Sequence, residues 1–85
     1  TGLRNQLVVL LAMKRNEEAL KVSRQLPDDE ALTHYLRAVC LNRLEQMSDA
    51  YDELTKAIQM DPSLKQVAHT DGDVNDLLLD SNDNN

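Results

Sequence analysis

Apolar residues recur at intervals of three and four along most of the chain, a spacing that places them on one face of an α-helix. The first set consists of Leu3, Leu7, Leu10 and Leu11. A polar break at residues 14–16 follows, and the spacing resumes with Ala19 and Leu20 up to Pro27, which cannot continue a helix. The pattern predicts two short helices joined by a turn.

Three further helices are predicted after Pro27, over residues 29–44, 48–60 and 63–70. Pro62 closes the second of them, and an Asp-Gly pair at residue 71 breaks the third. A last turn or two is expected from Val74 to Leu79, before a polar end.

Acidic and hydroxyl side chains stand at two of the predicted helix starts. Asp28 and Asp29 precede the third helix, and Ser48 precedes the fourth. Their oxygens can accept hydrogen bonds from free backbone N–H groups, so we expect them to act as N-caps. The alternative for Asp28, Asp29 and Glu30 is a charged docking patch.

The first part of the chain aligns with the second when it is shifted by 31 residues. The shift pairs Arg4 with Tyr35, Val8 with Val39, Leu10 with Leu41, Met13 with Leu44, and Glu18-Ala19 with Asp49-Ala50. The chain therefore contains two copies of one helical unit.

The second copy resembles a tetratricopeptide repeat. The resemblance is carried by Ala38, Leu41, Ala50, Leu54 and the closing Pro62. Small residues at these positions let helices approach closely, and the leucines fill the space beside them. The copy departs from the family pattern at three positions, where His34 replaces Trp, Arg37 replaces Leu and Glu45 replaces Gly.

The resemblance implies an all-α fold of antiparallel helical hairpins, stacked as a short right-handed α-solenoid of about two repeats with C-terminal capping helices. Residues 1–28 would be a first, shortened hairpin and residues 29–62 the second. Residues 63–80 would form the cap and residues 81–85 a disordered tail. The apolar residues expected to cover the last hairpin are Leu64, Val67, Leu77 and Leu78.

Composition and charge narrow the possible partners. Hydrophobic residues make up 41% of the chain, but Tyr35 and Tyr51 are its only aromatic residues. The chain has nine basic and fifteen acidic residues, and five of the acidic residues lie in residues 71–85. Residues 1–70 therefore hold nine basic and ten acidic residues and are nearly neutral. Nucleic-acid binding needs clustered bases or stacking aromatic residues, so we expect no nucleic-acid partner.

No segment predicts membrane insertion or a secretory signal, because the longest apolar run, residues 7–13, is too short. Solenoids of this kind usually need about three repeats, so we expect further repeats or another domain before Thr1. The family is widespread in bacteria, and the compartment stays open between cytoplasm and cell envelope.

Few residues are candidates for metal binding or catalysis. Asp71, Asp73 and Asn75 have the spacing of a calcium-loop start, but Asp76 stands where that loop needs Gly, so a capped helix start is the better interpretation. The two histidines lack a third metal ligand. Pairing of the single cysteine, Cys40, with His34 would lack an orienting partner. We expect a non-enzymatic protein without cofactor or metal.

Protein or peptide binding is the predicted function. In the family, the first helix of each hairpin lines a concave groove, and the resemblance places there Arg4, Val8, Leu11, Ala12, Tyr35, Val39, Asn42 and Arg43. Asn42 would bond a peptide backbone and the arginines would pair carboxylates of an acidic, apolar segment. For Val8, Tyr35 and Val39, internal packing is an equally good interpretation.

A second interpretation is purely architectural. The chain would then end a longer array or self-associate as a homo-oligomer, without a ligand of its own.

Overall fold

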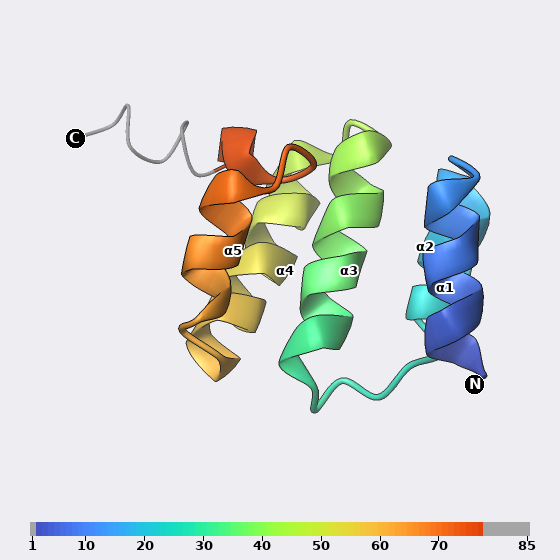
Figure 1. Ribbon diagram of the computed structural model, residues 1–85, viewed down its shortest axis with the longest axis horizontal. Coiled ribbons are helices and arrows are strands. Elements are labelled where there is room, and N and C mark those ends of the chain that lie inside the picture. The colour runs from blue at the N-terminus through green and yellow to red at the C-terminus, as the bar shows by residue number, and fades with distance from the viewer. Residues whose placement is uncertain (1, 78–85) are drawn as a thin grey trace.

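The helical spacing of the apolar residues produces a chain of short α-helices (Figure 1). The computed structural model describes residues 2–77, and no β-strand occurs in that range. The helices are α1 (Leu3–Ala12), α2 (Asn16–Ser23), α3 (Ala31–Arg43), α4 (Met47–Met60) and α5 (Leu64–Thr70). Residues 75–77 are helical as well. The all-α prediction is confirmed over this range.

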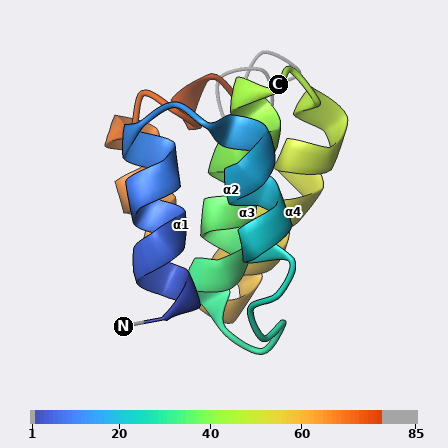
Figure 2. The same cartoon turned by 90° about the vertical axis from the view of Figure 1, so that its right-hand side faces the viewer.

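Neighbouring helices pack in chain order, α1 on α2, α2 on α3, α3 on α4 and α4 on α5. Short loops join α1 to α2 and α3 to α4, so each of these pairs is an antiparallel hairpin. Figure 2 shows α1 and α5 at the left of the molecule and α4 at the right, with α3 between them. Helix α3 is therefore the central element of the fold.

Small residues lie where the helices approach one another. The fully buried alanines are Ala19, Ala38, Ala50, Ala57 and Ala68. Leu7, Leu41 and Leu54 are buried beside them and fill the remaining core volume. Such pairing of small and large residues allows close helix contact without cavities.

The predicted N-caps are wrong. Glu30 precedes α3, and α4 begins at Met47, one residue before Ser48; neither helix has a side-chain cap hydrogen bond. The carboxylate of Asp28 instead accepts a charge-assisted hydrogen bond from Arg37 at 2.7 Å, a stronger contact than a neutral amide offers.

The C-terminal part covers the end of the α3–α4 hairpin with residues that were only partly predicted. Leu64 is partly buried and Leu77 is buried, as expected, but Val67 is 48% exposed. Ala68, one turn after Leu64 on the same face of α5, is fully buried, as expected for the apolar side of this helix. Val74 is also fully buried. Leu78 and the predicted tail lie outside the described residues.

Candidate protein-binding face

Two side chains join α1 to α3, one near each end of the helices. Arg4 donates to the Glu30 carboxylate at 2.7 Å, just before α3 begins. Arg43, the last residue of α3, donates to the main-chain carbonyl of Leu11 at 2.8 Å. The starts and the ends of α1 and α3 are thus paired, so the two helices run in the same direction.

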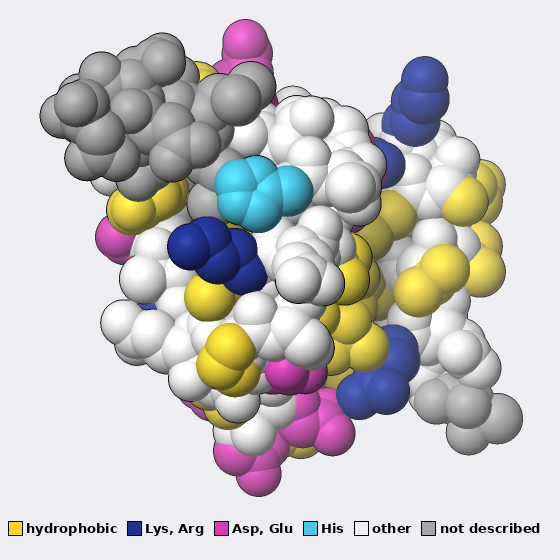
Figure 3. Space-filling view, turned by 60° about the vertical axis from the view of Figure 1, so that its left-hand side comes forward, with side chains coloured by type: hydrophobic (Ala, Val, Ile, Leu, Met, Phe, Trp, Pro, Cys, Tyr) yellow, Lys and Arg dark blue, Asp and Glu magenta, His cyan; other side chains and the backbone are white. Residues whose placement is uncertain are grey.

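Apolar side chains occupy the stretch between these two contacts. Leu32, Leu36 and Val39 precede Arg43 at helical spacing, so they share the face of α3 that Arg43 turns toward α1. Val8 lies midway along α1 and is 52% exposed. Figure 3 shows hydrophobic side chains lining a hollow between α1, at the right of the view, and the rest of the molecule. We call this the α1–α3 hollow.

The predicted groove residues differ in their access to solvent. Arg4, Val8 and Ala12 are exposed, whereas Leu11, Tyr35 and Val39 are buried. Asn42 and Arg43 are partly buried.

Leu32 and Leu36 were not among the predicted groove residues. Leu32 is 38% exposed and Leu36 is partly buried. Their spacing of seven and three residues before Val39 is the signal that could have found them.

Three of the predicted groove side chains contact residues 71–77 of the same chain, which we call the C-terminal segment. The Tyr35 hydroxyl donates to the Asp71 carboxylate. Asn42 donates through its amide nitrogen to the Asp73 carbonyl and, at 3.0 Å, to the Asp76 carboxylate. Arg43 pairs with the Asp73 carboxylate at 2.8 Å. Figure 1 shows this segment, in orange-red, beside the end of α3.

The contacts of the C-terminal segment raise the pKa values of Tyr35 and Arg43. Burial and the adjacent Asp71 raise the pKa of Tyr35, which keeps its hydroxyl protonated as a donor. The hydrogen bond to Asp73 raises the pKa of Arg43. Asp71 also accepts the main-chain N–H of Asp73 at 2.9 Å, which closes a local turn. Between residues 2 and 77, no three acidic, His or Cys side chains are grouped to hold a metal ion.

His34 links three parts of the fold. Its Nδ1 lies 2.6 Å from the Glu53 carboxylate on α4, and its Nε2 lies 2.7 Å from the Asp28 carbonyl in the loop before α3. Both ring nitrogens of His34 are therefore paired with groups other than the Cys40 thiol. Burial raises the pKa of the Cys40 thiol to about 11, which keeps this side chain a neutral, packed residue.

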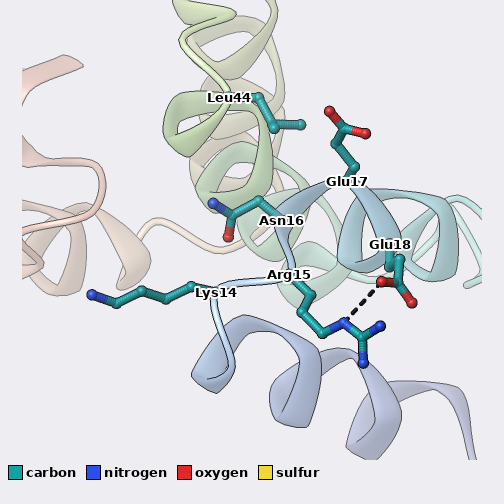
Figure 4. A pocket seen from close by; sticks show the side chains of 6 residues that line it. All are labelled: Lys14, Arg15, Asn16, Glu17, Glu18 and Leu44. Atoms are coloured by element: carbon teal, nitrogen blue, oxygen red, sulfur yellow. Dashed lines mark ion pairs between the residues drawn. The ribbon is translucent and has the colours of Figure 1, made fainter.

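A second depression lies at the turn between α1 and α2, with a volume of about 360 Å³ (Figure 4). Its lining consists of Lys14, Arg15, Asn16, Glu17, Glu18 and Leu44. Arg15 is paired with Glu18 at 2.9 Å, so the charges are balanced within the depression. Lys14 points away from the other side chains in Figure 4. The depression therefore presents no concentrated charge to a ligand.

No helix within the described range is long and apolar enough to cross a membrane. Comparison of the chain with family models, curated proteins and solved structures gave no match.

Proposed function

We propose that this chain is a non-enzymatic protein-interaction module of the tetratricopeptide-repeat type, in which the helical hairpins stack as a short solenoid and the α1–α3 hollow binds a peptide. The observation that carries the proposal is the placement of exposed apolar side chains between two guanidinium groups. Val8 and Leu32 supply the apolar surface, and Arg4 and Arg43 stand at the two ends.

The size of the hollow defines the length of the ligand. Seven residues separate Arg4 from Leu11, which corresponds to about 10 Å along a helix. An extended peptide covers that distance with about three or four residues. The fitting ligand has a short apolar middle flanked by carboxylates, which can pair with Arg4 and Arg43 in place of Glu30 and Asp73.

The experiment is a selection of peptides from a random display library on the immobilised chain, followed by affinity measurements with the selected sequences. We expect acidic sequences with apolar centres, and we expect Val8→Asp and Leu32→Asp each to weaken their binding at least tenfold. Val67→Asp and Met60→Asp place the same charge on exposed positions of other helices and serve as controls. Absence of enrichment, or equal binding by all four variants, would contradict the proposal.

Substitutions of Tyr35 and Arg43 are unsuitable for this purpose. Both side chains contact the C-terminal segment, so their loss would remove groove side chains and the contacts that hold the segment at the same time.

An architectural function is the second candidate, and the burial of Val74 and Leu77 over the last hairpin favours it. A chain that only ends an array or self-associates would select no peptide. Its mass measured by sedimentation would rise with concentration if it forms a homo-oligomer.

A further inference from the structure

The C-terminal segment is held by side chains that recognise specific groups. Arg43 contacts both oxygens of the Asp73 carboxylate, Nε to Oδ1 at 3.2 Å and Nη2 to Oδ2 at 2.8 Å. Asn42 donates to the main-chain carbonyl of the same residue. Forked pairing with a carboxylate and capture of a backbone carbonyl are the contacts by which proteins bind peptides.

Apolar residues complete the attachment. Val74 and Leu77 are buried and lie three residues apart, so they reach the same side of the helical turn that begins there. The segment therefore has a defined pattern, with carboxylates at Asp71 and Asp73 and apolar residues one and four positions after the second carboxylate.

We propose that the C-terminal segment is an internal ligand of the binding face, and that the external partner carries the same pattern of acidic and apolar residues. The inference rests on the proposed function, because it extends the peptide site from the α1–α3 hollow along α3 to Tyr35 and Asn42. Arg43 joins the two parts, since it contacts Leu11 at the end of the hollow and Asp73 in the segment.

The covalent connection to α5 explains why the C-terminal segment occupies the binding face in the isolated chain and an external peptide does not. The segment follows α5 directly, so its local concentration at α3 is in the millimolar range or above. An external peptide that matches only the segment competes poorly with it. A partner that also fills the hollow gains the additional contacts with Val8 and Leu32 and displaces the segment.

The test uses a fluorescent, N-acetylated peptide with the sequence of residues 71–77 and the full chain carrying Asp73→Lys and Val74→Asp. These substitutions place a positive charge against Arg43 and a negative charge at a fully buried position, so they release the segment. The control variant, Asp52→Lys with Val67→Asp, makes the same changes at exposed positions. Binding is followed by fluorescence anisotropy, and folding by circular dichroism.

We expect the released variant to bind the peptide saturably, at least tenfold more tightly than the wild type and the control variant do. Adding Arg43→Gln to the released variant should abolish this binding. Asp73→Asn, a milder release, should give an intermediate affinity.

A released variant that is folded but does not bind the peptide would overturn the inference. Loss of the helical circular dichroism of the released variant would also overturn it, because the segment would then be required for folding. These results are distinct from failure of the proposed function. If display-selected peptides bind wild type and released variant equally and depend on Val8, the hollow is a binding site and only the internal ligand is refuted.

Discussion

Lys14 and Glu45 lie 31 residues apart and adopt the same left-handed backbone conformation, with φ angles of 61° and 64°. In each turn the following residue donates its N–H to the carbonyl five positions earlier, at 2.9 Å in both cases. This is the hydrogen bond of a Schellman motif, whose left-handed position favours Gly. The sequence offset of 31 residues is therefore repeated in the geometry of the two inter-helix turns.

Glu45→Gly should stabilise the chain. A side chain in the left-handed region costs about 1–2 kcal/mol, part of which is offset by the greater flexibility of Gly in the unfolded state. We expect the free energy of unfolding to rise by about 0.5–1 kcal/mol, measured by thermal and urea unfolding with circular dichroism. Gln46→Gly is the matched control, because its φ is −96° and Gly brings no relief there. A Glu45→Gly chain no more stable than the control would contradict the interpretation.

Arg37 is a buried cation that fixes the end of α2 against α3. Its guanidinium donates twice to the Ser23 carbonyl, at 3.1 and 2.9 Å, and once to the Leu26 carbonyl at 3.2 Å. It also donates to the Asp28 carboxylate at 2.7 Å. The Ser23 carbonyl at the end of α2 also accepts the Leu26 N–H at 3.2 Å, so Arg37 adds donors from another helix to this carbonyl and to the Leu26 carbonyl that follows.

Arg37→Leu should destabilise the chain although Leu is the residue that the tetratricopeptide pattern has at this position. The substitution removes the guanidinium donors of the Ser23 and Leu26 carbonyls and the partner of the Asp28 carboxylate, and we expect a loss of about 2–4 kcal/mol in urea unfolding. The control is Arg15→Gln, which removes an exposed pair with Glu18 and should change stability by less than about 0.5 kcal/mol. Equal effects of the two substitutions would show that the buried contacts contribute little.

The contacts of Arg37 could not be predicted from the sequence, although the helices that they join could. The helices were predictable because their apolar spacing is local, and the same spacing placed Ala19 on the apolar face of the second helix. The guanidinium contacts were not, since they join Arg37 to residues 9 to 14 positions away whose backbone groups have no sequence signal. The N-cap prediction at Asp28 failed because α3 begins only at Ala31, and the Asp28 carboxylate pairs with Arg37 instead.

The donor groups of Asn42 and Arg43 could be named from the sequence, but the residue that they contact could not. Asn42 and Arg43 were expected to bond a backbone and to pair a carboxylate, and in the structure both groups come from residue 73 of the same chain. Contacts between residues 30 or 31 positions apart depend on how the chain turns after α5, which composition and periodicity do not encode. Whether an external partner uses the same side chains stays a prediction.

The ion pair between Asp28 and Arg37 should make stability depend on pH in the acid range. The Arg37 guanidinium lowers the pKa of Asp28, so the folded state favours the ionised carboxylate. The resulting stabilisation is present above the unfolded pKa of about 3.9 and is lost as the pH falls below it. Asp28→Asn should therefore be less stable than wild type at neutral pH, and the difference should narrow between about pH 4 and pH 2.

Urea unfolding at a series of pH values measures this difference. The same Asp28→Asn substitution in an Arg37→Leu background is the control, because the guanidinium that lowers the pKa is then absent. A pH-dependent difference that persists in that background would assign the effect to another group.

Cys40 should report the opening of the α3–α4 hairpin through its reactivity. The thiol is 0% exposed, and burial raises its pKa to about 11, whereas a free cysteine has a pKa of about 8.5. Alkylation by iodoacetamide requires both access and the thiolate. At pH 8 we therefore expect the folded chain to react far more slowly than the chain in concentrated urea, as measured by mass spectrometry over time.

The alkylation rate should then follow the stability of each variant. If the thiol reacts only from the open chain, the rate is proportional to the open fraction, so Glu45→Gly slows labelling and Arg37→Leu accelerates it. A stabilisation of about 1.4 kcal/mol corresponds to a tenfold slower reaction, which allows the labelling and the urea data to be compared directly. Labelling of the folded wild type at the rate of the urea-unfolded chain would instead mean that Cys40 is accessible, and that α3 and α4 do not pack around it as the structure shows.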